Sequence, residues 1–327
     1  MSTTSLCPAL PEVQDELTRR EFVAALTAAG LLAACGRDRV TAPDGAATRT
    51  VTSHNGPVEV PADPGRVVAA IGSFEIDMVA VGVMPVLTTS FAGPWVKLGS
   101  SVKITENIPP DPEELLALRP DLMLGWNWVT AEPVYEKLVK IAPYVGLGES
   151  AATAGPGFEN GPLKSWGTLF LSVCDVLGRR PEGERLVAEL ETRLDRLAER
   201  RSGQPRLRVA RIEFYKSGSF SWRGQDEDTA ELMRRIGLEV VGPATSERDQ
   251  SLERLAEIDA DRLIIPVGSE SIPRAVYEEV AATPLFRAIP AVAAGRVDLV
   301  DARLWPGLGH LWARALVDDL ERLYVPA

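Results

Sequence analysis

Histidine and cysteine are scarce in this chain, whose 327 residues include two histidines and three cysteines. The sequence has no HExxH, no CxxC and no histidine-rich tract, so we expect no intrinsic cofactor and no metal site built from protein ligands. Cys7 and Cys35 lie near the amino terminus, which leaves Cys174 alone in the body and excludes a disulfide within it. Cys174 ends an apolar helical run, which predicts a buried, unreactive thiol.

The common motifs of phosphate binding and acyl transfer are missing as well. The sequence contains neither a GxxxxGKS/T loop nor a GxSxG turn. Gly307 and Gly309 begin a GxGxxG pattern, but Trp312 stands at the position of its third glycine. We therefore predict no catalytic residue and no enzyme, and these absences favour binding over catalysis.

Long hydrophobic runs are also lacking, and the longest apolar stretch near the amino terminus is short. Residues 22–34 are 13 uncharged residues, whereas a membrane-spanning helix needs about 20. Arg19 and Arg20 precede this run and resemble a twin-arginine export signal, while the LAAC sequence that ends at Cys35 resembles a bacterial lipobox. We predict a signal peptide over residues 1–34 and lipidation of Cys35. The alternative is a buried amino-terminal helix.

Acidic residues outnumber basic ones, which bears on the class of partner. The whole chain carries 35 basic and 46 acidic residues, and its formal net charge is −11. Without residues 1–34 the remainder keeps 33 basic and 42 acidic residues. A surface of this sign disfavours nucleic acid as a partner, because nucleic acid requires a basic face.

Beyond a tether predicted for residues 35–56, short apolar runs alternate with helical patterns in two blocks. The blocks cover residues 57–162 and 203–327, and such alternation is typical of parallel sheets with crossover helices. Between them, residues 163–202 are predicted to form a connecting helix, because four leucines share one helical face: Leu186, Leu190, Leu194 and Leu197. The predicted fold is α/β, with two lobes joined by one long helix.

Four segments resemble the periplasmic binding proteins of iron–siderophore and vitamin B12 ABC importers. These are residues 60–68 (VPADPGRVV), 80–86 (AVGVMPV), 111–122 (DPEELLALRPDL) and 288–297 (AIPAVAAGRV), the last followed by Asp301 and Trp305. The resemblance implies two Rossmann-like lobes with a ligand cleft between them, the class III periplasmic binding protein fold. It also implies an extracytoplasmic, membrane-anchored lipoprotein that captures a ferric siderophore and delivers it to an ABC permease dimer.

Ligands of parallel sheets bind beyond the carboxyl ends of the strands, so the loops after the predicted strands are the candidate site. These loops are residues 72–75, 91–100, 125–129, 213–224, 268–272 and 303–310. They are rich in aromatic and cationic side chains, which suit the apolar shell and the oxygen atoms of a ferric chelate that brings its own iron ligands. The predicted ligand-binding residues are Trp95, Lys97, Trp126, Trp128, Tyr215, Trp222, Arg223, Arg303 and Trp305. Trp166 and Trp312 are predicted to lie in the core instead.

Glu113 and Glu253 each fall in the first turn of a predicted short helix, one in each lobe. An acid there complements the helix dipole, which is one explanation for both. The family resemblance supplies the other, because one acid on each lobe pairs with arginines of the permease dimer. Glu114 is the alternative to Glu113.

Other functions remain open at this stage. A corrinoid or haem is the alternative ligand, for which Tyr215 and His310 are the conspicuous axial candidates. An extracytoplasmic enzyme or a signalling receptor on the same scaffold is the alternative of another class.

Overall fold

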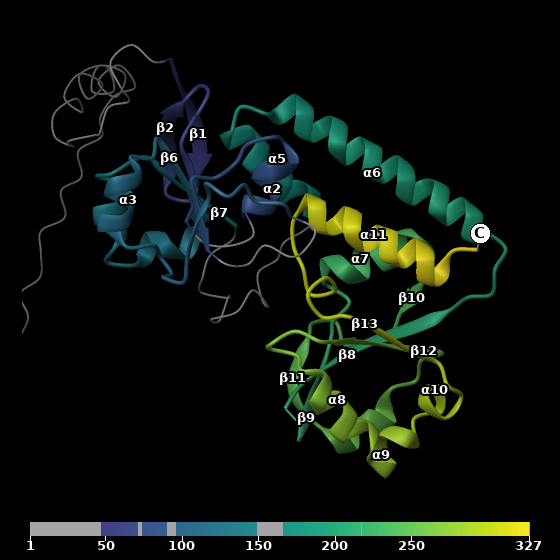
Figure 1. The fold of residues 1–327 in the computed structure, drawn as a ribbon. Coiled ribbons are helices and arrows are strands. Elements are labelled where there is room, and N and C mark those ends of the chain that lie inside the picture. Colours follow the sequence, from purple (N-terminus) through teal and green to yellow (C-terminus); the bar gives the residue numbers. More distant parts are fainter. Residues whose placement is uncertain (1–46, 71–73, 90–95, 149–165, 217, 327) are drawn as a thin grey trace, which may run out of the picture. The chain divides into compact units, whose positions relative to one another are not determined.

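The computed structural model describes residues 47–70, 74–89, 96–148, 166–216 and 218–326 (Figure 1). The chain divides into two compact units, residues 1–39 and 40–327, and every described residue belongs to the second. Trp95 and Cys35 lie outside the described residues, and so does the side chain of Trp166. No helix among the described residues combines the length and the apolar character needed to cross a bilayer.

The first sheet is entirely parallel and has the order β5-β4-β3-β6-β7. Its strands are short and mostly buried, as is usual where helices cover a parallel sheet. They are β3 (Val67–Ala69), β4 (Leu87–Thr89), β5 (Lys103–Thr105), β6 (Leu122–Trp126) and β7 (Tyr144–Leu147). The helices between them are α2 (Phe74–Ala80), α3 (Pro112–Leu118), the 3-10 helix η1 (Asn127–Ala131) and α4 (Tyr135–Leu138).

A hairpin of β1 (Thr48–Ser53) and β2 (Gly56–Pro61) precedes this sheet and corrects one prediction. The sequence indicated a tether as far as residue 56, but ordered structure already begins in the described part at β1. The hairpin is attached to β7, because the backbone N–H of His54 donates to the carbonyl of Gly146 at 3.0 Å and the Ser53 hydroxyl accepts from the N–H of Gly146, also at 3.0 Å. The weak periodicity of residues 48–56 concealed a strand that gains its stability from this pairing.

The region between the lobes contains two helices, whereas the sequence predicted one. They are α5 (Trp166–Val176) and α6 (Arg180–Arg201). Buried residues of α5 belong to the core of the first lobe, and Cys174 is buried there with a thiol pKa that burial raises to about 12. The two helices approach closely, since a Cβ added to Gly183 would lie 2.5 Å from the Sγ of Cys174.

The leucine stripe of α6 is buried as predicted, and it serves both cores. Leu186 packs in the core of the first lobe, whereas Leu190, Leu194 and Leu197 pack in a core of the second. The helix α11 (His310–Tyr324) lies alongside α6 (Figure 1), and Arg193 of α6 pairs with Glu321 of α11 at 2.6 Å. A single rigid helix therefore contributes to the packing of both lobes.

The second sheet has the order β11-β9-β8-β12-β13, and β10 pairs with β8. Its strands are β8 (Arg208–Lys216), β9 (Ser219–Trp222), β10 (Glu239–Val240), β11 (Glu247–Ser251), β12 (Arg262–Val267) and β13 (Val297–Asp301). The strands β9 and β11 are antiparallel, which corrects the expectation of a purely parallel sheet. A hairpin connection needs only a few residues, so β9 returns beside β8 without a crossover helix.

Helices cover both faces of this sheet and complete two hydrophobic clusters. They are α7 (Asp228–Arg235), the 3-10 helix η2 (Leu252–Glu257), α8 (Arg274–Ala281), α9 (Pro284–Arg287), α10 (Pro290–Ala293) and α11. Trp312 of α11 is completely buried, which confirms its predicted place in the core.

The start of α11 contacts α2 of the first lobe. The carboxylate of Asp77 accepts from the backbone N–H of His310 at 2.6 Å, and the His310 ring stacks on Phe170 with centroids 4.5 Å apart. Gly309 has a φ of 92°, and a Cβ there would lie 2.8 Å from Oδ1 of Asp77. Burial, opposed by the His310 hydrogen bond, raises the pKa of Asp77 to about 7, and burial lowers the pKa of His310 to about 4.

Candidate functional site

The carboxyl ends of the parallel strands gather most of the residues that the sequence proposed for the ligand. In the first lobe, Trp126 ends β6 and Trp128 follows it. In the second lobe, Tyr215 lies near the carboxyl end of β8 and Arg303 follows β13, and β9 returns beside β8 with Trp222. The topology thus brings together, within each lobe, residues that are far apart in sequence.

Trp126 and Trp128 do not extend one strand, because β6 ends at Trp126 and a 3-10 helix begins at Asn127. The Asn127 side chain donates to the carbonyl of Gly148 at 2.7 Å and fixes this turn beside the end of β7. Trp126 is 8% exposed and packs against Phe74 at a centroid distance of 5.1 Å, whereas Trp128 is half-buried. Of this pair, Trp128 presents the larger surface to a ligand.

Trp222 and Trp305 are core residues in this conformation. Trp222 is 9% exposed, and its indole N–H donates to the carbonyl of Val241 at 3.4 Å. Trp305 has no exposed surface, and its indole N–H donates to the Asp319 carboxylate at 2.7 Å. A buried tryptophan whose N–H is satisfied serves packing, so neither residue offers a ligand surface here.

Arg223 belongs to a buried cluster of alternating charges on one side of β8. Its guanidinium lies 2.5 Å from the Glu227 carboxylate and 3.6 Å from that of Glu213. Arg211 pairs with the same two carboxylates and also donates to the carbonyl of Trp305 at 2.9 Å. Tyr215 is 37% exposed and donates its hydroxyl to Glu213 at 2.6 Å, so it connects the buried cluster to the surface.

The two arginines of this cluster favour the ionised form of the Glu227 carboxyl despite its burial. Burial opposes ionisation of Glu227, but Arg211 and Arg223 outweigh it and hold the pKa of that carboxyl below its usual range. Burial, reinforced by Glu213, raises the pKa of the Tyr215 hydroxyl, which therefore stays protonated as a donor. The residues around the two guanidinium groups enclose no space for a water molecule, so the cluster is a closed, charge-balanced unit.

Arg303 and Lys97 lie at the surface. Arg303 is engaged with Asp301 at 2.6 Å, and this contact holds the pKa of the Asp301 carboxyl below its usual range. Lys97 is exposed and has no ion-pair partner among the described residues. Both are accessible to a ligand, but only Lys97 carries an uncompensated charge.

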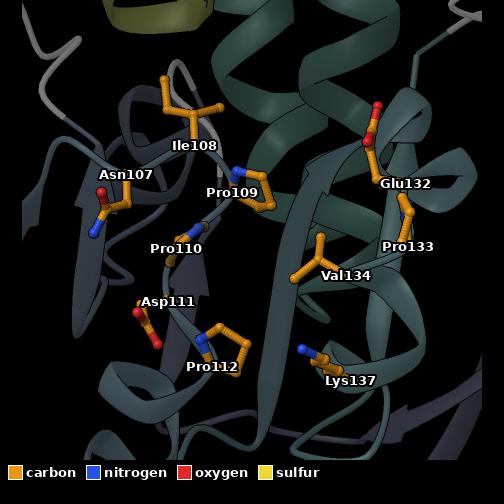
Figure 2. A pocket seen from close by; sticks show the side chains of 10 residues that line it. All are labelled: Asn107, Ile108, Pro109, Pro110, Asp111, Pro112, Glu132, Pro133, Val134 and Lys137. Carbon is orange, nitrogen blue, oxygen red and sulfur yellow. The ribbon is translucent and has the colours of Figure 1, made fainter.

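A groove of about 620 Å³ lies beyond the carboxyl ends of β5 and β6 (Figure 2). The segment 107–112 forms one wall, and residues 132–134 with Lys137 form the opposite wall. Its polar side chains are Asn107, Asp111, Glu132 and Lys137, and the remainder is proline, Ile108 and Val134. The sequence analysis did not identify this groove, although the prolines at 109, 110, 112 and 133 were visible as a local enrichment.

Glu113 and Glu253 occupy equivalent places in the two lobes. Asp111 caps α3 by accepting from the N–H of Glu113 at 2.8 Å, and Ser251 caps η2 by accepting from the N–H of Glu253 at 3.4 Å. Both glutamates are exposed and have no ion-pair partner within the described residues, whereas Glu114 pairs with Lys103 at 2.8 Å. Glu113 is therefore the freer of the two acids on α3.

The sequence analysis missed Arg211, Glu213 and Glu227. The signal for the first two was an alternation, because residues 211, 213 and 215 are polar and share one face of a strand whose other face is apolar. Across the described residues, no group of three or more histidine, cysteine, aspartate or glutamate side chains could hold a metal ion. His310 is buried at the start of α11 and presents almost no surface to solvent.

Comparison with known proteins identifies a family of binding proteins. A model of the periplasmic binding protein family matches residues 83–304, and no curated protein matches the chain. Three similar solved structures are a periplasmic solute-binding protein of Mycobacterium smegmatis (21% identity, TM-score 0.69, 84% of this chain and 96% of that one), Staphylococcus aureus SirA complexed with staphyloferrin B (19%, 0.66, 85% and 99%), and a FhuD-fold component of a ferrichrome ABC transporter from Bacillus subtilis (15%, 0.67, 83% and 98%).

These neighbours share the whole arrangement of two α/β lobes, since each alignment covers more than four fifths of this chain. The predicted class III architecture is confirmed by the two sheets, the helix α6 and this structural similarity. The family model covers more than half of the sequence. The chain belongs to the periplasmic binding protein family.

Proposed function

We propose that this protein is an extracytoplasmic solute-binding protein that captures a ferric siderophore and delivers it to an ABC permease. The observation that carries the proposal is the similarity over most of the chain to solved proteins of this fold whose descriptions name siderophore ligands or a ferrichrome transporter. The aromatic surfaces of Trp128 and Tyr215, together with Lys97, supply the contacts that an iron chelate needs. The protein performs no catalytic turnover in this proposal.

Titration of the purified protein with ferric siderophores tests the proposal directly. Trp128 is half-buried beside the proposed site, so bound chelate is expected to quench tryptophan fluorescence with a saturable dependence on concentration. The titration should include hydroxamate, catecholate and carboxylate chelates. Absence of quenching by all three, with saturable binding of a corrinoid or haem instead, would assign the ligand to the alternative class.

Glu113 and Glu253 are proposed as the contacts with the permease. One exposed, unpaired acid in the capped first turn of a helix in each lobe suits a dimeric partner with a basic residue on each subunit. The double variant Glu113→Lys/Glu253→Lys is expected to reduce uptake of the chelate by at least about tenfold while its affinity for the chelate changes less than about twofold.

A matched control is available for this experiment. Glu136 of α4 and Glu279 of α8 are exposed acids, one in each lobe, without ion-pair partners among the described residues. The variant Glu136→Lys/Glu279→Lys changes the net charge by the same amount and should leave uptake intact. Equal losses in both double variants would refute specific docking and indicate a general effect of charge.

Membrane attachment through Cys35 is proposed from the sequence, and a cell-fractionation experiment addresses it. Cys35→Ala should move the protein from the membrane fraction to the soluble extracytoplasmic fraction, because the lipobox cysteine is the site of the acyl anchor. Affinity for the chelate should not change. Retention of the variant at the membrane would contradict the lipoprotein assignment.

A further inference from the structure

The charges around the proposed ligand site nearly cancel, and this balance constrains the ligand. Among the described segments that follow the parallel strands of the first lobe, including the groove in Figure 2, the cations are Lys97 and Lys137. Three exposed carboxylates accompany them, namely Glu106, Asp111 and Glu132, and Glu75 lies buried at the start of α2. The first lobe therefore offers this region a slight excess of negative charge.

The second lobe provides cations at this edge, but its structure neutralises them. Lys216 lies 2.8 Å from Asp249, and Arg303 lies 2.6 Å from Asp301. Arg274 at the start of α8 and Glu270 in the preceding segment contribute one charge of each sign. Arg248 lies beside the same Asp249 carboxyl, so each of these cations has a carboxylate near it in space or in sequence.

The buried cluster beneath this edge repeats the same balance. Arg211 and Arg223 face Glu213 and Glu227, and each guanidinium contacts both carboxylates. The neighbouring carboxylates therefore cancel most of the positive potential of the two guanidinium groups at the surface beyond Tyr215. An anion bound at this edge would compete with carboxylates that already occupy the cationic partners.

The chain as a whole has a formal net charge of −11. Neither the local nor the long-range electrostatics favour a multiply charged anion.

Ferric chelates differ in charge according to their donor groups. Each hydroxamate loses one proton on binding iron, so a ferric tris-hydroxamate core is neutral. Each catecholate loses two protons, so a ferric tris-catecholate core carries a triple negative charge. We propose, on the basis of the siderophore-binding function proposed above, that this protein selects neutral ferric tris-hydroxamate chelates and rejects ferric tris-catecholates.

The selection has a physical origin in what each chelate meets at the site. A neutral chelate gains apolar contact with Trp128 and Tyr215 and forms individual hydrogen bonds, at little electrostatic cost. A trianionic chelate must lose its hydration without finding an unpaired cation other than the lysines of the first lobe. The protein therefore discriminates between them mainly by disfavouring the trianionic chelate.

Two titrations with matched probes test the inference. Ferrichrome serves as the neutral tris-hydroxamate and ferric enterobactin as the tris-catecholate, with dissociation constants from tryptophan quenching at low ionic strength. Ferrichrome should bind at least about tenfold more tightly. Equal or tighter binding of ferric enterobactin overturns this inference and leaves the siderophore function standing. Failure of both, and of carboxylate chelates, overturns the function itself.

Release of the paired cations supplies an independent test. In Asp249→Asn/Asp301→Asn the carboxylates that neutralise Lys216 and Arg303 become neutral amides of similar shape. The ratio of the two dissociation constants should then shift toward ferric enterobactin by about threefold to tenfold, and added salt should reduce the shift.

The same sheet offers a control for this variant. Asp259 pairs with Arg208 at 2.9 Å at the opposite, amino-terminal end of β8. Asp259→Asn removes one paired carboxylate away from the proposed site, so the affinity ratio should stay unchanged. An unchanged ratio in Asp249→Asn/Asp301→Asn, or an equal shift in Asp259→Asn, refutes charge balance at this edge as the origin of selectivity.

Discussion

The two lobes accommodate their buried polar groups near the strand ends in different ways. In the first lobe, neutral side chains bond to the backbone: Asn127 donates to the Gly148 carbonyl, Tyr144 donates to the Trp126 carbonyl at 3.0 Å, and Ser53 accepts from Gly146. In the second lobe, a network of two arginines and two glutamates performs this role. Loss of one neutral hydrogen bond affects only its two partners, whereas removal of one ion leaves buried charges without their counter-ion.

Removal of Arg211 is expected to give the largest difference in stability loss between the two lobes. Arg211→Met leaves Glu213 and Glu227 facing a single guanidinium in a buried site, so the free energy of unfolding should fall by about 3–5 kcal/mol. Urea denaturation measures the loss. The first-lobe counterpart, Ser53→Ala, removes the two neutral contacts of this hydroxyl with Gly146 and should cost about 1–3 kcal/mol. A loss in Arg211→Met no larger than in Ser53→Ala would contradict the distinction.

The contact between Asp77 and α11 combines features of both lobes, since a buried carboxylate here bonds to a backbone N–H. Its pKa of about 7 in the folded protein exceeds the ordinary value of 3.8, so folding favours the protonated acid. The contribution of Asp77 to stability is therefore fully present below about pH 4 and is lost as pH rises toward 7.

Asp77→Asn mimics the protonated acid and should remove this dependence. The unfolding free energy of Asp77→Asn minus that of the parent protein should increase by about 2 kcal/mol between pH 5 and pH 8. Urea denaturation of both proteins at each pH measures this difference. The groups around Asp77 are Glu75 on α2, Cys174 on α5, and His310 and Arg314 on α11. His310 has the opposite dependence, because burial lowers its pKa, but it is present in both proteins. A pH-independent difference would contradict the assignment.

The junction of α5 and α6 provides a smaller test, confined to the core of the first lobe. Gly183→Ala places a methyl group 2.5 Å from the Cys174 thiol, and the resulting displacement should cost about 1–2 kcal/mol despite the higher helix propensity of alanine. Cys174→Ala removes the Sγ and should restore part of this loss when combined with Gly183→Ala. Strict additivity of the two substitutions in thermal denaturation would show that the contact is not tight.

The smallest effect is expected from the exposed pair of Arg303 and Asp301. Both side chains retain access to solvent, so Arg303→Ala should leave the midpoint of urea denaturation unchanged within error. A clear loss of stability would show that surface pairs of this lobe contribute as much as the buried cluster.

The sequence predicted the fold well wherever patterns were local. The two blocks of alternating strands and helices, the leucine stripe of α6 and the short helices that carry Glu113 and Glu253 appear where the spacing of residues indicated them. It missed the hairpin of β1 and β2 and the antiparallel strands β9 and β11. These strands depend on partners distant in sequence, and nothing in their own residues specifies that pairing.

The loops proposed for the candidate site contain both accessible and buried residues of the selected types. Loop position and residue type selected Trp128, Tyr215 and Arg303, which are partly or largely accessible, but they also selected Trp305, which is fully buried. A tryptophan after a strand can turn toward the ligand or toward the core, and the choice depends on a partner such as Asp319 fourteen residues later in sequence.

The sequence by itself determined the alternation of strands and helices, the apolar stripe of α6, the capped turns that carry Glu113 and Glu253, and the overall acidity. Each follows from spacing or composition within a short stretch of chain. Only the tertiary structure decided which cations remain free, because neutralisation of Arg223 or Lys216 depends on carboxylates brought near by the sheet. That decision, in turn, sets the charge of the ligand that this edge can accept.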